Sequence, residues 1–574
     1  MAPKRPNKRR QDDDGTSSRL PKKGGKNKRE LTYDTYDEAM DGGVDMEEKG
    51  ERYRDGDKAQ RFYEKALDLY KKAYDFEPTY DAAYNQARVL FTLATSFFLP
   101  PTSVSYLTTS IELYRHAVTL TENTLLQLDA GYNLAQALLE LAEVIEDLHS
   151  ERVDQIRSIR NEAREMLEQV MLGQEEYIAA NAEDLEMDQA SEMLGQAEAA
   201  GPGEEVPVEG EGMDVDAPAA TDGEGDQETS TYETHVPTPG SLVDTALLLV
   251  DTHLTLWKSL QPSSPPNEAQ QIAVRSVLDR AGKIVPPGRQ AEVDLAEIKV
   301  LLAMDEVVWE AYKADAKAGT GVEKSLEGAV SALTTLLESL DVQPPEQPTL
   351  RAEILTTLAE THSTTAYRLL FLAPQLPPDP SPLAQAAWFN LSQAVTHWGK
   401  ALDLPSSADT PKTFKPSVLL ELSKASLSRA KLKDVNETAK KNAAQLIDNS
   451  LTYAIRAAES LAWGSFVKPG IGAPAAPYQG GWDMEWLART VLLQLIRIDF
   501  VAQNDMPVTE QTKKQLEVSG RGLIKRLEGL GGDRRISAGD YQRWVEEIID
   551  EEEGISDAER EFWQGLALAS QKKA

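Results

Sequence analysis

The chain has 574 residues and a formal net charge of −34, with 94 Asp and Glu against 60 Lys and Arg, no cysteine and six histidines. The absence of cysteine excludes disulfides, a thiol nucleophile and any thiolate zinc site. The negative charge disfavours direct binding to nucleic acid or to an anionic membrane, because both would repel the protein. No apolar run approaches the roughly 18 residues of a membrane-spanning helix, and the basic start lacks the apolar segment of a signal peptide, so we expect a soluble intracellular protein.

The first 30 residues are basic, with eleven Lys and Arg against four Asp and Glu, a net charge of +7. Lys8, Arg9 and Arg10 form one cluster, and Lys22 and Lys23 begin a second after a polar spacer. This spacing resembles a bipartite nuclear localisation signal. It predicts that residues 1–50 are a disordered tail bound by a nuclear import receptor, and that the protein is nuclear, with shuttling to the cytoplasm left open. A solvated basic tail, or one that contacts RNA, is the alternative.

Most of the remaining chain predicts helices. From Gly56 onward, apolar residues recur at spacings of three and four, and proline and glycine gather between segments of about 15–25 residues. Such lengths favour stacked helical hairpins over a coiled coil. We assign residues 56–173 to a first set of hairpins.

Internal similarity identifies the type of hairpin. Two segments place small, aromatic and small residues at spacings of four and three, and two others share a Tyr-Asn pair: Ala66, Tyr70 and Ala73; Ser110, Tyr114 and Ala117; Tyr84 and Asn85; Tyr132 and Asn133. These patterns resemble the two helices of the tetratricopeptide (TPR) repeat. The resemblance implies an all-α fold, a right-handed α-solenoid of stacked TPR-like hairpins. Small residues let the helices approach closely while the aromatic ring fills the adjacent hole.

The TPR resemblance also implies a binding groove. The asparagine of the Tyr-Asn pair faces the concave surface in such repeats, which would place Asn85 and Asn133 there, with Arg88 and Gln136 about one turn further on. Amide and guanidinium groups in a groove can hydrogen-bond the backbone or a carboxylate of an extended peptide. The alternative is that all four are solvated polar residues on a helix face.

An acidic tract interrupts the helical pattern at residues 174–239. Residues 174–235 hold 19 Asp and Glu and no Lys or Arg, with few aromatic residues. A segment of this composition cannot bury enough apolar surface to offset its chain entropy, so it predicts disorder. The tract is either a polyanion that shields a basic client protein or a solubilising linker between two helical halves.

Helical patterns resume after the tract and continue to the end. Residues 240–467 predict degenerate TPR-like hairpins, in which Ala394, Trp398 and Ala401 keep the repeat spacing. Residues 468–481 form a Pro- and Gly-rich loop, followed closely by Trp482 and Trp486, and we expect this region to pack across the array because exposed Trp is costly. Residues 482–574 predict an acidic helical cap, with a separate peptide motif as the alternative.

The sequence offers no catalytic constellation. No two of the six histidines stand at helical i, i+3 or i, i+4 spacing, and the nucleophile-elbow and Walker patterns are absent. We therefore predict no enzymatic activity, no cofactor and no metal.

Two functions fit these features. The first is a nuclear protein-binding adaptor, an acidic chaperone or escort for a basic client such as a histone or a ribosomal protein; its organisation is similar to that of TPR histone chaperones whose repeats an acidic segment interrupts. The second is a regulatory scaffold in translation or transcription. The start Met1-Ala-Pro-Lys-Arg-Pro6 and the all-helical body faintly resemble the fungal enhancer-of-translation-termination family, which is also nuclear and repeat-like.

Overall fold

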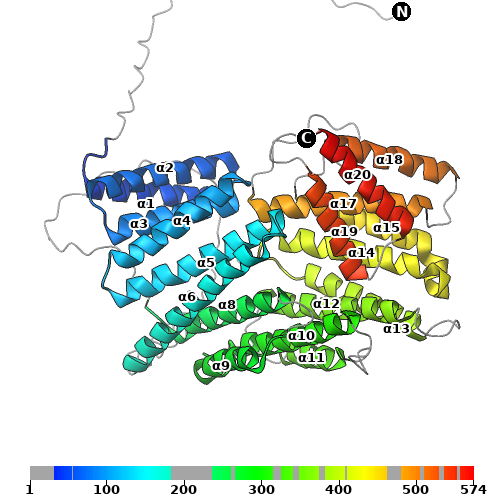
Figure 1. Ribbon diagram of the computed structural model, residues 1–574, viewed down its shortest axis with the longest axis horizontal. Coiled ribbons are helices and arrows are strands. Elements are labelled where there is room, and N and C mark those ends of the chain that lie inside the picture. The colour runs from blue at the N-terminus through cyan, green and yellow to red at the C-terminus, as the bar shows by residue number, and fades with distance from the viewer. Residues whose placement is uncertain are drawn as a thin grey trace, which may run out of the picture.

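The helices of the chain pair into antiparallel hairpins that stack along the sequence (Figure 1). The computed structural model describes residues 32–54, 56–182, 236–259, 265–286, 288–314, 325–340, 348–373, 382–407, 410–461, 480–504, 510–528, 536–552 and 556–573. Within these residues every regular element is helical, so the predicted all-α solenoid of TPR-like hairpins is confirmed. None of the described helices is both long and apolar enough to cross a bilayer.

Among the described residues, the N-terminal half of the array contains five hairpins. Each pairs a first helix with a second helix, and their bounds are α1 (Tyr36–Tyr53) with α2 (Gly56–Phe76), α3 (Tyr80–Ser96) with α4 (Thr102–Thr119), α5 (Thr124–Leu148) with α6 (Val153–Ala180), α8 (Pro239–Lys258) with α9 (Glu268–Ile284), and α10 (Gln290–Ala314) with α11 (Glu327–Leu340).

The C-terminal half follows the same plan. Its bounds are α12 (Pro348–Leu372) with α13 (Pro382–Leu402), α14 (Phe414–Lys431) with α15 (Glu437–Ser460), α17 (Trp482–Asn504) with α18 (Glu510–Glu528), and α19 (Ala538–Glu552) with α20 (Asp557–Lys573). A short 3₁₀ turn, Leu432–Asp434, joins α14 to α15. The segment predicted as a cap therefore adds two further hairpins.

Local sequence fixes where several helices begin. Thr79 and Asn436 accept a hydrogen bond from the third residue beyond them, which satisfies one free N–H of α3 and of α15. Thr238 and Asn267 form capping boxes with Ser241 and Gln270: each side chain of a pair accepts a hydrogen bond from the backbone N–H of the other residue. These caps mark the hairpin boundaries that proline and glycine only approximate.

The repeat positions form the core between helices. Every residue of the three small-large-small sets has an exposed fraction of 1% or less: Ala66, Tyr70, Ala73, Ser110, Tyr114, Ala117, Ala394, Trp398 and Ala401. The hydroxyl of Ser110 donates to the carbonyl of Ala87, 2.7 Å away, and the hydroxyl of Tyr70 donates to Glu47 at 2.9 Å, so these buried polar groups are satisfied. The packing interpretation of the TPR pattern is therefore confirmed.

The first helix corrects the prediction that residues 1–50 are disordered, because α1 begins at Tyr36. Its glycines are contact points: a Cβ on Gly43 would lie 2.4 Å from the Tyr70 ring, and one on Gly50 would lie 2.8 Å from the Tyr63 ring. Glycine and acidic residues weaken the helical signal in the sequence. In the fold, the same glycines let α1 pack directly on the aromatic side chains of α2.

The acidic tract begins later in the structure than in the sequence. Helix α6 continues past Gly173 to Ala180, and Glu175 forms an ion pair with Arg280 of α9 at 2.6 Å. This pairing neutralises an acidic residue that the composition had assigned to the tract. Residues 183–235, which hold the rest of the tract, lie outside the described residues.

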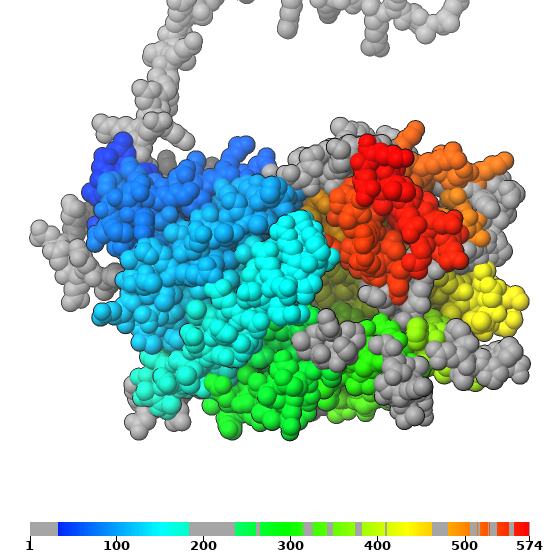
Figure 2. Space-filling model, in the orientation of Figure 1, coloured from blue at the N-terminus to red at the C-terminus, as the bar shows by residue number. Residues whose placement is uncertain are grey.

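The array curves until its C-terminal hairpins reach the turn between α5 and α6. In Figure 1 this turn points at α17 and α19, and Figure 2 shows the cyan end of α5 and α6 against the orange and red C-terminal helices. The backbone N–H of Gly481 donates to the carbonyl of Ser96 at 3.0 Å. A Cβ at Gly481 would lie 1.6 Å from the Thr95 carbonyl oxygen, so this approach requires glycine.

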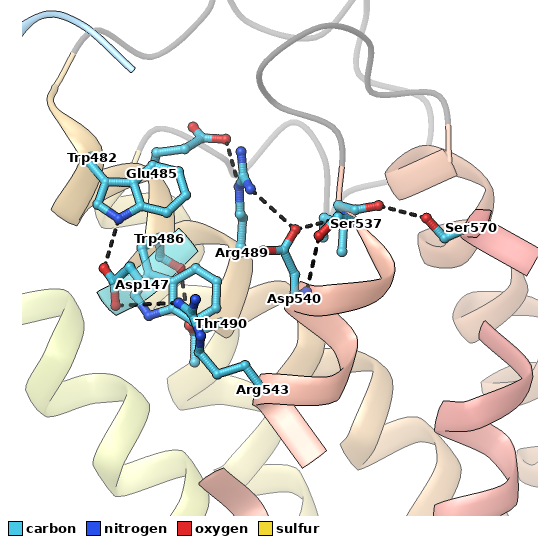
Figure 3. A network of polar contacts seen from close by, with 11 residues as sticks. Asp147, Trp482, Glu485, Trp486, Arg489, Thr490, Ser537, Asp540, Arg543 and Ser570 are labelled. Carbon is cyan, nitrogen blue, oxygen red and sulfur yellow. Dashed lines mark hydrogen bonds and ion pairs between the residues drawn. The ribbon is translucent and has the colours of Figure 1, made fainter. Parts of the chain in front are cut away.

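We call the contact between α5, α17 and α19 the closing junction (Figure 3). Trp482 Nε1 donates to Asp147 Oδ2 at 2.7 Å, and Arg543 Nη1 reaches Asp147 Oδ1 at 3.3 Å. The Arg543 guanidinium also lies 4.6 Å from the Trp486 ring centroid. The expectation that Trp482 and Trp486 pack across the array is confirmed, whereas residues 468–479 of the predicted loop lie outside the described part of the chain.

Candidate functional site

The first helices of successive hairpins face the inside of the curve, and four of them, α8, α10, α12 and α14, enclose a groove that we call the inner groove. Its central hollow has a volume of about 930 Å³. Asp251 and Lys299 also line a neighbouring hollow toward α5, and Glu306 and Glu360 line another toward α14. The hollows therefore join into one groove that runs across several hairpins.

Ion pairs neutralise part of the charge in the inner groove. Lys299 lies 2.7 Å from Glu353, and Lys313 lies 2.7 Å from Glu310. The Arg368 guanidinium pairs with Glu306 at 2.6 Å and with Asp305. The Lys299 and Arg368 pairs join α10 to α12, whereas Lys313 and Glu310 lie on α10 together, and only some of the carboxylates are left available.

Two carboxylates in the inner groove form no ion pair with a described residue, Asp251 of α8 and Glu360 of α12. Both are exposed to solvent inside the groove, with protein atoms of the neighbouring helices around them. Burial raises the pKa of Asp251, against the opposing effect of Lys299. Burial, followed by repulsion from Glu421, raises the pKa of Glu360 to about 7. Both groups are thus less stabilised as anions than an ordinary surface carboxylate.

A second group of carboxylates lies beside the closing junction, where α5 faces α17. Burial, reinforced by Asp483, Glu143 and Asp147, raises the pKa of Glu140 to about 8. Burial and Asp483 raise the pKa of Glu143, and burial raises that of Asp483 itself. None of Glu140, Glu143 and Asp483 forms an ion pair with any residue that the structure describes.

The chemistry of such carboxylates favours a cationic ligand. A lysine or arginine side chain that enters the groove would add positive charge beside Asp251 and Glu360, beyond the partial effect of Lys299 and Lys258. A charged hydrogen bond of this kind is stronger than a neutral one. The inner groove is therefore suited to a basic, extended segment.

The structure places two of the predicted groove residues inside the N-terminal hairpins instead. Asn85 is only 6% exposed, and its predicted role in peptide binding stays a prediction. Arg88 Nη2 pairs with Glu47 of α1 at 2.9 Å and donates to Asn85 Oδ1 at 3.4 Å. The sequence did not reveal α1, whose Glu47 carboxylate holds Arg88 and also accepts a hydrogen bond from the Tyr70 hydroxyl.

The other two predicted groove residues lie together on α5. Asn133 Nδ2 donates to the Tyr84 hydroxyl at 2.8 Å and to the Asp129 carbonyl at 3.0 Å, so its amide ties α5 to α3. Gln136 is half-buried one turn further along the same helix. Their predicted role in peptide binding stays a prediction.

The predicted localisation residues, Lys8, Arg9, Arg10, Lys22 and Lys23, lie outside the described residues. Across the part of the chain that the structure does describe, no cluster of three or more His, Asp or Glu side chains has the arrangement of a metal site. The histidines that come closest to each other, His362 and His397, stack at 5.6 Å between ring centroids.

Sequence reasoning missed the residues of the inner groove. Asp251 and Glu360 are two of 94 acidic residues, and nothing in their immediate sequence separates them from solvated ones. A usable signal existed in principle, because both lie on first helices among positions that face the neighbouring hairpin.

Comparisons with known proteins give only loose likenesses. No family model matches the chain, and no curated protein matches it. Among solved structures, a "circular tandem repeat protein with novel repeat topology" has 12% identity and a TM-score of 0.27, covering 89% of this chain and 99% of that one. Nro1, titled a nuclear import adaptor and "hypoxic regulator of sterol synthesis", has 14% identity and a TM-score of 0.29, covering 75% and 98%. Yeast Tom70 has 11% identity and a TM-score of 0.16, covering 92% and 96%.

Proposed function

We propose that this chain is a non-enzymatic protein-binding adaptor whose inner groove holds a basic, extended segment of a client protein. The observation that carries the proposal is that Asp251 and Glu360, on opposite walls of the groove, form no ion pair with any residue that the structure describes, and that the pKa of each is raised. A lysine or arginine side chain between them would replace repulsion and lost hydration with attraction.

The shape of the groove supports an extended ligand. The hollows continue from Asp244 on α8 to Glu421 on α14, so a bound segment would contact several hairpins at once. Stacked repeats commonly bind partners along such an inner surface. Alternating acidic and basic side chains along the walls would select the order of charges in the client.

Three features of the sequence extend this proposal. The acidic tract would gather a basic client near the groove, and the clusters at Lys8–Arg10 and Lys22–Lys23 would bind an import receptor and bring the protein into the nucleus. A histone or a ribosomal protein has the required basic segments. These parts of the proposal rest on sequence alone.

The test is a binding titration with full-length protein and a fluorescein-labelled 15-residue peptide rich in Lys and Arg. Asp251→Asn combined with Glu360→Gln should weaken binding by roughly tenfold or more, since two charged contacts are lost. The matched control, Asp279→Asn with Glu338→Gln, removes the same charge from exposed positions on the second helices α9 and α11. It should bind like the unmodified protein.

Two results would count against the proposal. Equal weakening by both double variants would mean that net charge alone attracts the peptide. A second peptide, with glutamate in place of each Lys and Arg, serves as the comparison. If it bound as tightly as the basic peptide, the basis for a basic client would be removed and the regulatory scaffold would be favoured. Raising the salt from 50 to 300 mM should weaken the true complex, because the contacts are ionic.

A further inference from the structure

Helix α2 carries a basic and aromatic stripe that the inner groove does not explain. Lysine alternates with apolar residues at spacings of four and three along one flank, and we call these residues the α2 seam: Lys58, Phe62, Lys65, Leu69, Lys72 and Phe76. The three lysines and Phe76 are exposed, and Phe62 and Leu69 are half-buried. Residues at these spacings share one face of a helix.

The lysines of the α2 seam are held by aromatic rings and not by carboxylates. Lys58 Nζ lies 3.5 Å from the ring centroid of Tyr53, Lys65 Nζ lies 5.7 Å from that of Phe62, and Lys72 Nζ lies 5.7 Å from that of Phe76. None of the three lysines forms an ion pair with a residue that the structure describes. Their charges are thus available in a protein whose net charge is −34.

The position of the α2 seam shows that it is an unpartnered face. The acidic residues of α2 lie about a quarter turn away and face α4, since Glu64 and Asp68 act on the pKa of Tyr106. The seam lies on the other flank, at the N-terminal end of the array. In Figure 1, α2 lies along the upper edge of this end with no labelled helix above it, and on the seam itself the Tyr53 ring of α1 stacks on Phe62 at 5.6 Å between ring centroids.

We propose that the α2 seam docks an acidic amphipathic helix of a partner protein. The three lysines match carboxylates, while Phe62, Leu69 and Phe76 match an apolar stripe at the same spacing of three and four. A helix laid there would stack as a further repeat at the open end of the array. The chain's own first 30 residues, with a net charge of +7, have the wrong sign to cover it.

This surface would complete an adaptor with two sites of opposite charge. The inner groove would bind a basic segment, and the α2 seam would bind an acidic helix of a second protein. The α2 seam stands on its own contacts, so its test does not depend on the groove.

The experiment measures the fluorescence anisotropy of a labelled 21-residue peptide that places leucine along one helical face and glutamate on both sides of it. The full-length protein should bind this peptide at least tenfold more tightly than a scrambled peptide of the same composition. Lys58→Glu with Lys65→Glu and Lys72→Glu should abolish the preference, and Phe76→Ser alone should weaken binding several-fold. The control, Lys71→Glu with Lys283→Glu and Lys441→Glu, makes the same charge change at exposed positions elsewhere and should leave binding unchanged.

Each other outcome overturns the proposal. Equal binding of the scrambled peptide would reduce the surface to a non-specific charge effect. Tighter binding of a 20-nucleotide single-stranded RNA, lost in the α2 seam variant, would make the partner a nucleic acid. If deletion of residues 183–235 raised the affinity for the labelled peptide more than tenfold, the chain's own acidic tract would be identified as the occupant of the α2 seam. Because Asp251→Asn with Glu360→Gln should not change this binding, failure of the seam and failure of the groove are distinguishable.

Discussion

The indole nitrogen of Trp482 donates to the carboxylate of Asp147, which lies 335 positions earlier in the chain, at 2.7 Å. This bond and the ion pair between Arg543 and Asp147 join the fifth helix of the array to its last hairpins. The C-terminal end of the solenoid is consequently tied back to α5. The curvature that shapes the inner groove is held by side chains as well as by the stacking of neighbours.

Replacing Trp482 with phenylalanine should loosen the closing junction while keeping its apolar packing. The lost hydrogen bond to a charged group contributes about 1.5 kcal/mol, so local opening should become roughly tenfold more frequent. Hydrogen–deuterium exchange should therefore accelerate in the first turn of α17 and the last turn of α5. Trp388→Phe, on α13, should leave both segments unchanged, and unchanged exchange in Trp482→Phe itself would contradict the account of the junction.

The packing of α1 on α2 can be tested with two glycine substitutions. Gly43→Ala should lower the free energy of unfolding by about 1–3 kcal/mol, because its Cβ would lie 2.4 Å from the Tyr70 ring. Gly282→Ala, in α9, has no heavy atom within 4 Å of the added Cβ. It should raise the free energy of unfolding by about 0.5–1 kcal/mol through its better helix propensity. Denaturant titration of both variants checks this, and a neutral Gly43→Ala would show that α1 does not pack there.

Glu140 should make stability depend on pH. Its pKa is about 8 in the fold and 4.5 as the ordinary value, so the folded state holds a proton more tightly than the unfolded state. Its stabilising contribution is complete below pH 4.5 and is lost as the pH rises through 8. Glutamine imitates the protonated form, so Glu140→Gln should raise Tm at pH 8.5 by about 1–2 °C and change it little at pH 4.5.

A thermal-shift series from pH 4.5 to 8.5 checks the prediction for Glu140. The control is Glu122→Gln, an exposed position just before α5, which should leave Tm unchanged at both limits. A gain of equal size at pH 4.5 and at pH 8.5 would show that burial of Glu140 does not control its ionisation.

Binding of a basic peptide should release protons. With a pKa of about 7, Glu360 is about half protonated at pH 7, and a cation in contact with it lowers that pKa. Calorimetry at pH 7 in two buffers of different ionisation enthalpy should give different apparent enthalpies of binding. Glu360→Gln should reduce the difference, and identical enthalpies for the unmodified protein would argue against contact with Glu360.

The fold was predictable from the sequence to the extent that its signals are local. The small-large-small spacing around Tyr70, Tyr114 and Trp398 identified the hairpins, because that spacing is itself the packing rule of the repeat. Helix α1 was missed for the opposite reason. Its Gly43 and Gly50 lower helix propensity, and only contact with the rings of α2 compensates for them.

The candidate site was much less predictable. Asn85 and Arg88 fit the repeat pattern, but α1 supplies Glu47 as the partner of Arg88, and no local sequence pattern predicts this ion pair. The closing junction depends on residues 335 positions apart, and the inner groove depends on which of many carboxylates remain without a cation. Both properties arise from curvature and stacking, which a single sequence does not encode in any one segment.

The central claim is that a basic segment lies in the inner groove between Asp251 and Glu360. Zero-length carbodiimide coupling of the lysine-rich peptide to full-length protein, followed by mass spectrometric mapping, tests it most directly, because only carboxylates in contact with a lysine amine are joined to it. The account predicts that the amide cross-links concentrate on Asp251 and Glu360 and disappear from these positions in the Asp251→Asn, Glu360→Gln variant. Cross-links confined to residues 183–235 or to the outer second helices would contradict it.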